Sequence, residues 1–230
     1  MAIPLYLAMT AAEFSHCSAV PTHPAWMSCR FSPSGTSLSN LPSSLPAGTL
    51  LILDDQTPPA GHDIALIREQ LSEIIKSNRC SGLLLDFQRP DDPQTAQIAA
   101  ALVTLPYPVC VSEQYAADLS CPVFLPPCPL TVPLVEHLSP WGNRQVWLEA
   151  ATDSCTFVIT EQGCRQAPCD TGGSFPHTDN TLHCHYYIET APGAVRFSLR
   201  RTPEDLSQLL QEAKALGVTH AVGLWQELTP

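Results

Sequence analysis

A chain of 230 residues can form one α/β barrel or two smaller domains, and with 44% apolar and 14% charged residues it is not disordered throughout. Its 22 acidic residues outnumber the 11 basic ones and give a net charge of −11. This charge argues against nucleic acids and anionic membrane surfaces as partners. A small or neutral ligand fits better, and a protein partner stays open.

The ten cysteines are too small a share of the chain for a disulfide scaffold. The start of the sequence lacks the basic and long apolar regions of a signal peptide, and no apolar run approaches the roughly 18 residues of a membrane-spanning helix. We therefore expect a cytoplasmic protein with mostly reduced thiols. Because no glycine-rich phosphate loop is present, we predict no cofactor.

Eight apolar segments predict β-strands. Most of them are continuous rather than alternating apolar runs, which is typical of strands that are buried on both faces of a parallel sheet. The predicted strands are residues 3–9, 26–31, 49–55, 81–88, 108–113, 121–126, 145–149 and 219–225.

Helical patterns lie between several of these strands. Apolar residues recur at helical spacing between Ile64 and Ile75, and Asp92 followed by Pro93 is a helix start signal. Another capped helix begins at Thr202, before the last strand. Strands that alternate with helices predict right-handed crossovers and a parallel sheet, and eight strands close a barrel.

Two regions depart from this alternation. Residues 10–48 are rich in Ser, Pro and Thr and predict an irregular, helix-poor segment. Residues 155–200 predict antiparallel strands, with turns at Gly163 and Gly193. We therefore predict a single domain over residues 1–230, a reduced (β/α)8 TIM-type barrel with an antiparallel β subdomain inserted before the last helix and strand.

Polar residues that end the strands are the candidates for chemistry, because the active sites of α/β barrels lie at the carboxyl ends of their strands. The segment 81–88 reads Ser-Gly-Leu-Leu-Leu-Asp-Phe-Gln. It resembles the fourth strand of family-18 glycoside hydrolases, the chitinases and chitinase-like lectins, whose motif is D-G-x-D-x-D-x-E. Gly82, Asp86 and Phe87 match this motif. Its other three acidic positions hold Ser81, Leu84 and Gln88.

The end of the chain is also similar to these barrels. They often insert a small β-rich subdomain before a helix and a last strand that ends in tryptophan. Here the strands around Tyr186 and Val195 precede the capped helix, and the last strand ends at Trp225. By this resemblance Trp225 is the floor under a bound sugar ring, a role for which an aromatic face is suited.

The resemblance implies a substrate-assisted reaction in which a glutamic acid protonates the leaving oxygen while the acetamido group of the sugar attacks. The aspartate two residues earlier positions that group, and Asp86 matches it. Gln88 stands in place of the proton donor, however, and an amide cannot deliver a proton. We therefore expect a degenerate, chitinase-like site that binds a carbohydrate without efficient hydrolysis.

Two other hypotheses stay open. Retaining glycosidases on barrels use two carboxyl groups roughly 5 Å apart, so Asp86 could act with Glu113 or Glu149 in an active glycoside hydrolase. Alternatively, the barrel has a purely structural or protein-interaction role. The first hypothesis requires two carboxyl groups that face one cavity, and the second does not.

The remaining candidates are polar residues near the strand ends. Asp54 and Asp55 end the third strand, and together with Tyr6 in the first strand they complete the predicted substrate-binding set. We predict no metal site, because the aspartate doublet lacks a third spaced acid and C-x4-C without a second pair is a weak zinc signal. Whether zinc binds to the following cluster stays open: Cys164, Cys169, His183 and His185.

Overall fold

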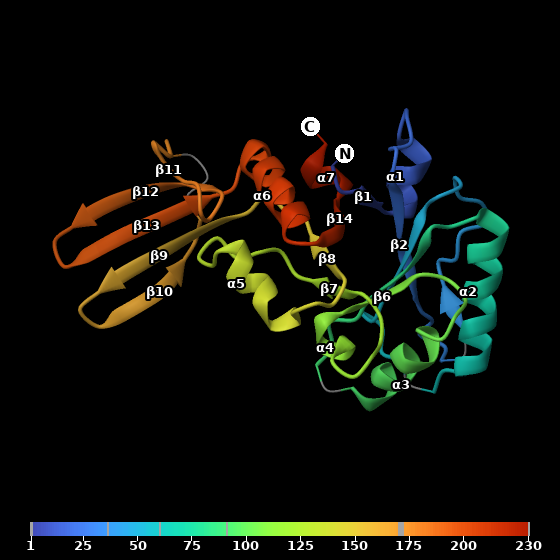
Figure 1. The fold of residues 1–230 in the computed structure, drawn as a ribbon. Coiled ribbons are helices and arrows are strands. Elements are labelled where there is room, and N and C mark those ends of the chain that lie inside the picture. Colours follow the sequence, from blue (N-terminus) through green and yellow to red (C-terminus); the bar gives the residue numbers. More distant parts are fainter. Residues whose placement is uncertain (1, 36, 60, 91, 170–172, 230) are drawn as a thin grey trace.

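The computed structural model describes residues 2–35, 37–59, 61–90, 92–169 and 173–229. Its main feature is a closed ring of eight parallel strands, in which β1 pairs with both β2 and β14 (Figure 1). The strands are β1 (Leu5–Met9), β2 (Pro24–Phe31), β4 (Leu50–Asp54), β5 (Gly82–Asp86), β6 (Val109–Ser112), β7 (Val123–Leu125), β8 (Val146–Glu149) and β14 (Val218–Leu224). Each corresponds to one of the eight predicted strands, and the predicted (β/α)8 fold class is confirmed.

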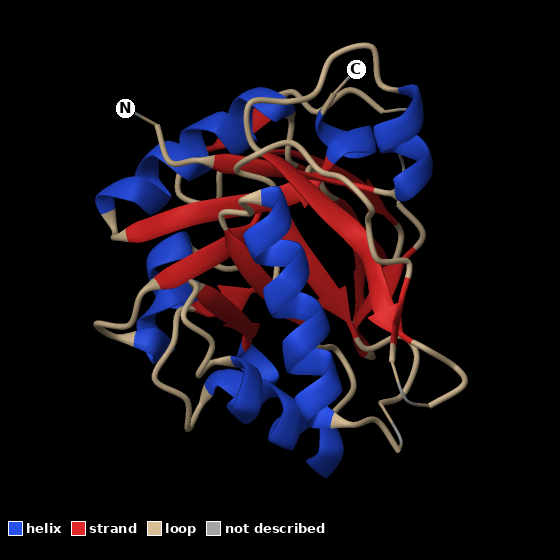
Figure 2. Ribbon diagram, turned by 90° about the vertical axis from the view of Figure 1, so that its right-hand side faces the viewer, coloured by secondary structure: helices blue, strands red, loops and turns tan. Residues whose placement is uncertain are grey.

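Helices lie on the outside of this ring, as Figure 2 shows from the side of α2. The helices are α1 (Ala11–His16), α2 (Ile64–Asn78), α3 (Pro93–Leu102), α4 (Glu113–Ala116), α5 (Leu134–Leu138), the 3₁₀ helix η1 (Ser139–Trp141), α6 (Pro203–Ala215) and α7 (Trp225–Leu228). Three of them are long, and each begins at a capping residue: Asp63, Asp92 and Thr202 accept backbone N–H groups at the starts of α2, α3 and α6.

The barrel is reduced where the sequence lacks helical periodicity. After β1 the chain forms only α1, which has six residues and no buried side chain. Between β2 and β4 the described residues contain no helix, and the two-residue strand β3 (Leu38–Ser39) pairs antiparallel with β2 instead. A short helix that buries no apolar face contributes little packing energy, so this side of the barrel depends on loops.

Two apolar regions hold the barrel together, because successive side chains of a strand point to opposite sides of the sheet. One set fills the interior of the ring, where Trp147, Phe124 and Tyr6 are the largest side chains. The other set faces outward under the helices, and Phe31 and Phe87 are completely buried there. This alternation decides which polar residues at the strand ends face the interior.

A second, antiparallel sheet is inserted between β8 and α6 and extends away from the barrel (Figure 1). It consists of β9 (Ser154–Thr160), β10 (Gly163–Ala167), β11 (His177–Asp179), β12 (Cys184–Ala191) and β13 (Ala194–Arg200), in the order β10-β9-β13-β12-β11. The inserted β subdomain is confirmed, but β10 and β11 were not predicted. Their residues are mostly exposed and polar, so no apolar alternation marks them.

No helix among the described residues is long and apolar enough to cross a membrane.

Candidate functional site

A pocket opens at the carboxyl ends of the barrel strands and contains three carboxyl groups, those of Asp54, Asp86 and Glu149. Its volume is about 90 Å³. The pocket is lined by Ala8, Met27, Ile52, Asp54, Gln56, Leu84, Asp86, Phe124, Glu149, Val222, Gly223 and Leu224. We call it the mouth pocket. It has an apolar floor and an acidic rim, and it is smaller than the pockets that enclose a whole drug-sized ligand.

Strand register brings the acidic groups together. Asp54 and Asp86 are direct neighbours on β4 and β5, and each follows an inward-facing residue by two positions, Ile52 and Leu84. Glu149 likewise follows the inward-facing Trp147 on β8. Because the side-chain period of a strand is two, all three carboxyl groups lie above the apolar filling of the barrel.

Asp54 is paired with a cation that the sequence analysis did not single out. The Nε atom of Arg30, near the end of β2, donates to Oδ2 of Asp54 over 2.9 Å. Burial nevertheless raises the pKa of Asp54, and the nearby charge of Asp55 adds to this, whereas the hydrogen bond from the Gln56 backbone and the Arg30 charge lower it. Arg30 therefore offsets part of the cost of placing an acid at the mouth.

Asp86 contacts the residue that replaces the proton donor of the chitinase motif. The Nε2 atom of Gln88 donates to Oδ1 of Asp86 over 2.5 Å. Burial raises the pKa of Asp86, the bond from Gln88 opposes that rise, and the charges of Asp54 and Asp55 add to it. The amide of Gln88 is a neutral donor, so it holds the carboxylate in place without supplying a transferable proton.

Glu149 is the acid with the most perturbed titration at the mouth. Burial raises its pKa from the ordinary 4.5 to about 7, and the negative charges of Asp86 and Glu227 contribute to the rise. A carboxyl group with this pKa is partly protonated near neutral pH and is suited to general acid or base catalysis. Glu227 lies on α7 and was not among the predicted site residues.

Asp55 faces away from the mouth pocket. Its two carboxylate oxygens accept the backbone N–H groups of Gln88 and Arg89 over 2.8 and 2.9 Å, and the residue is only 1% exposed. This follows from its position next to the inward-facing Asp54. Asp55 fixes the loop that carries Gln88 after β5.

Four other predicted site residues do not line the mouth pocket: Gln88, Glu113, Trp225 and Tyr6. Glu113 begins α4 and lines a separate recess of about 30 Å³ together with Gln88. Trp225 begins α7, and the strand residues before it line the mouth pocket in its place. Tyr6 lies two residues before Ala8 on β1, toward the opposite end of the barrel, where it stacks on Trp147 at a ring distance of 6.4 Å.

Sequence reasoning also missed much of the lining of the mouth pocket. Met27 and Leu224 are apolar strand residues like many others, and nothing in the sequence distinguishes them. Arg30 lies at the end of a predicted strand, the position at which the acids were found, so the same rule could have included it.

The cysteines and histidines considered for zinc are separated. His183 bonds Glu212 over 2.6 Å, and His185 lies 3.7 Å from Asp205, so both rings face acids of α6. The thiol of Cys169 donates to the carbonyl of Ser154. Within the described parts of the chain, no three His, Cys, Asp or Glu side chains form a group that could hold a metal ion.

The fold and the mouth pocket define an eight-stranded α/β barrel with acids at the carboxyl ends of its strands. Comparison with known proteins shows which barrels it resembles. No protein-family model and no curated protein matches the sequence. Solved structures do match the structure of this chain, and family-18 chitinases are among them. This chain therefore has a chitinase-like TIM-barrel fold.

Three solved structures illustrate the similarity. A mutant family-18 chitinase from Cycas revoluta in complex with (GlcNAc)4 has a TM-score of 0.60 and 11% identity, covering 98% of this chain and 96% of that one. The chitinase-like agglutinin of Robinia pseudoacacia has a TM-score of 0.57 and 14% identity, covering 98% and 95%. The spore cortex-lytic enzyme SleL of Bacillus cereus has a TM-score of 0.59 and 9% identity, covering 99% and 72%. At these identities the similarity establishes the fold.

Proposed function

We propose that this chain binds a carbohydrate with N-acetyl groups at the mouth of its barrel and does not hydrolyse it efficiently. The hydrogen bond from Gln88 to Asp86 carries this proposal. In the motif of family-18 glycoside hydrolases, Gln88 stands at the position of the proton donor, and Asp86 stands at the position of the aspartate that orients the acetamido group. The hydrogen bond therefore joins these two positions. With an amide at the first position, the family's reaction lacks its acid, while polar groups that can bind a sugar remain.

The size and lining of the mouth pocket favour a small polar substituent of a sugar as the group that binds there. Its volume of about 90 Å³ is enough for an acetamido group rather than for a chain of sugar rings. Ile52 and Leu84 offer an apolar floor to the methyl group, and the carboxylate of Asp86 can accept the amide hydrogen. Among proteins with this fold, one is described as an agglutinin and another was solved with (GlcNAc)4 bound, which agrees with a binding role.

Calorimetric titration with a chito-tetrasaccharide tests the proposal. We expect binding by the wild-type protein and a loss of about tenfold or more in Asp86→Asn, which keeps the shape but removes a charged acceptor. Asp118→Asn removes the same charge at an exposed position outside the mouth pocket and serves as the matched control. Absence of binding by the wild type at millimolar ligand, or equal losses in both variants, would overturn the proposal.

Hydrolysis by Asp86 and Glu149 is a second candidate function. It is favoured by the raised pKa of Glu149 and by the presence of both carboxyl groups in one pocket. Release of a chromophore from an aryl chito-oligosaccharide decides between the two. Turnover by the wild type that Glu149→Gln abolishes without loss of binding supports hydrolysis. If the wild type is inactive and Gln88→Glu gains turnover, the binding proposal is supported instead.

A further inference from the structure

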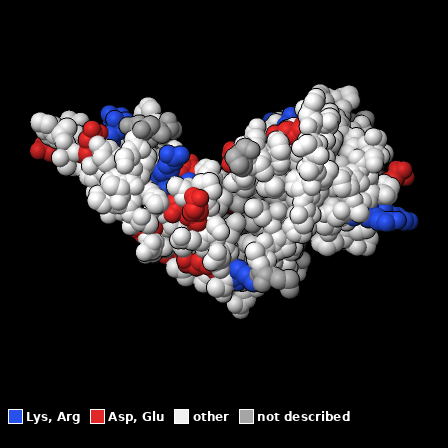
Figure 3. All heavy atoms as spheres, turned by 90° about the horizontal axis from the view of Figure 1, so that it is seen from above, with Lys and Arg blue, Asp and Glu red and all other residues white. Residues whose placement is uncertain are grey.

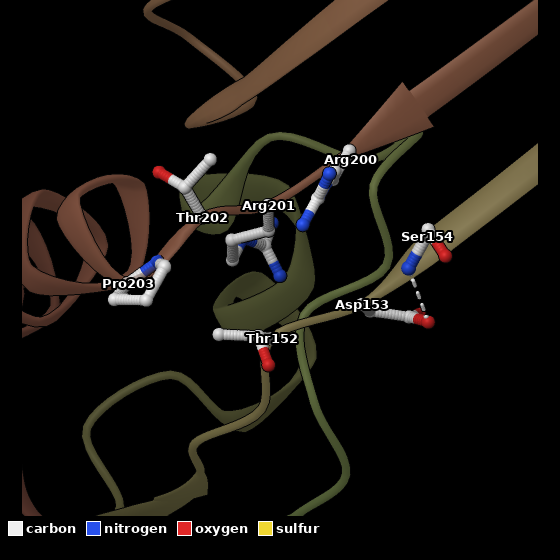
Figure 4. Close-up of a pocket in the computed structure, with 7 residues that line it drawn as sticks. All are labelled: Thr152, Asp153, Ser154, Arg200, Arg201, Thr202 and Pro203. Atoms are coloured by element: carbon white, nitrogen blue, oxygen red, sulfur yellow. Dashed lines mark hydrogen bonds between the residues drawn. The ribbon is translucent and has the colours of Figure 1, made fainter. Parts of the chain in front are cut away.

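A second pocket lies at the junction between the barrel and the inserted sheet, where the segments 152–154 and 200–203 run side by side (Figure 4). Its volume is about 350 Å³, which is in the range of small-molecule sites. It is lined by Thr152, Asp153, Ser154, Arg200, Arg201, Thr202 and Pro203. We call it the arginine pocket. The surface in Figure 3 is hollowed between the barrel and the projecting sheet.

The buried cation of this pocket has no acidic partner among the described residues. Arg201 is only 2% exposed, and its guanidinium group donates to the backbone carbonyls of Cys128, Leu182 and His183. These bonds give each of the three guanidinium nitrogen atoms a partner, but carbonyl groups do not neutralise a full charge. Among the described residues Arg201 forms no ion pair. Because buried charges are stable mainly when they are paired, a counter-ion beside Arg201 would lower its energy.

A second cation is exposed at the same pocket. Arg200 is the last residue of β13, pairs across the sheet with Ser154, and forms no ion pair among the described residues. Figure 4 shows its side chain beside that of Arg201. Asp153 is the only acid among the described residues that line the pocket, and its Oδ1 atom accepts the backbone N–H of Ser154 over 2.7 Å. Two cations and one acid give the pocket a positive charge in a protein whose net charge is −11.

The two pockets are close along the chain. Glu149 lines the mouth pocket and Thr152 lines the arginine pocket, so their backbones are separated by at most about 10 Å, the reach of three extended residues. This separation is within the length of a short oligosaccharide. Because acids surround the mouth, a negatively charged sugar is repelled there, whereas the arginine pocket attracts it.

We propose that the arginine pocket binds the carboxylate of an acidic sugar in a glycan whose neighbouring N-acetyl sugar occupies the mouth pocket. The choice of a sugar rests on the proposed function, whereas the anion site rests on the two arginines. The planar guanidinium of Arg200 suits bidentate hydrogen bonds to a carboxylate. Arg201 contributes a charge that no acid in the described part of the chain pairs with, and the hydroxyl group of Thr152 is a further donor in the lining.

Two tetrasaccharides test the proposal by calorimetric titration at about 0.15 M salt, where charges more than about 8 Å apart are screened. One alternates N-acetylglucosamine with glucuronate, and the other is the neutral chito-tetrasaccharide. We expect the acidic ligand to bind about tenfold more tightly, because a hydrogen bond to a charged group adds about that factor. Equal affinities for the two ligands, or tighter binding of the neutral ligand, would overturn the proposal of an acidic-sugar site.

Matched variants test whether the arginine pocket causes the tighter binding of the acidic ligand. Arg200→Gln should lose about tenfold in affinity for the acidic ligand and keep its affinity for the neutral one. Arg165→Gln is the control, because Arg165 is exposed on the same sheet but does not line the pocket. Asp153→Asn should strengthen binding of the acidic ligand, because it removes the opposing charge and keeps the oxygen that accepts Ser154. Equal losses in Arg200→Gln and Arg165→Gln would refute the site.

Failure of the proposed function is distinguishable from failure of this site. If neither tetrasaccharide binds, the carbohydrate proposal fails, and inorganic sulfate then tests the anion site alone. Sulfate binding that Arg200→Gln weakens and Arg165→Gln does not would support an anion pocket with another ligand source. Absence of sulfate binding would refute the pocket as an anion site.

Discussion

The raised pKa of Glu149 predicts a measurable cost in stability. In the folded protein this carboxyl group titrates at about 7 instead of its ordinary 4.5. The folded state therefore binds a proton more tightly than the unfolded state between these two values. Its contribution to stability is fully present below about pH 4.5 and is lost as the pH rises through about 7. At 1.36 kcal/mol per pKa unit, the full loss is about 3 kcal/mol.

The change Glu149→Gln removes the ionisable group and keeps its size. We expect the variant to be more stable than the wild type by about 2–3 kcal/mol at about pH 8, and by less than about 1 kcal/mol at about pH 5. Urea denaturation followed by tryptophan fluorescence measures both differences, since Trp147 lies inside the barrel beneath Glu149.

The control is Glu161→Gln, which removes one negative charge at an exposed turn of the inserted sheet. This control distinguishes a change in stability that comes from the burial of Glu149 from one that comes from the change in net charge. The reasoning is refuted if the stability gap between Glu149→Gln and the wild type is the same at both pH values, or if Glu161→Gln shows the same pH-dependent gap.

Two further predictions concern the loop and strand that carry the motif. Asp55→Ala should lower the free energy of unfolding by about 2–3 kcal/mol, because two backbone N–H groups lose their charged and buried acceptor. A loss below about 0.5 kcal/mol in urea denaturation would contradict this. Gly82→Ala should cost about 1–3 kcal/mol, since its Cβ would lie 2.7 Å from the Pro108 carbonyl oxygen. Gly173→Ala, whose Cβ meets nothing within 4 Å, is its control in the same assay, and equal effects would contradict the steric argument.

The sequence predicted the barrel because its strands are buried on both faces. A strand such as β4 must be apolar at every position, so its five residues are all buried and stand out as a continuous run. β10 was missed for the opposite reason: it lies at the edge of the inserted sheet with four exposed residues out of five. An exposed edge strand imposes no apolar pattern, so no local signal identifies it.

The composition and order of residues by themselves determined that this chain forms an α/β barrel and that carboxyl groups end several of its strands. Only the tertiary structure decided which of them meet. Asp54 and Asp55 are adjacent in sequence, yet one lines the mouth pocket and the other holds a loop. Tyr6 is on a barrel strand but lies toward the other end of it. The physical reason is that side chains alternate along a strand, so the register between strands, a property of the closed ring, selects the residues that face one another.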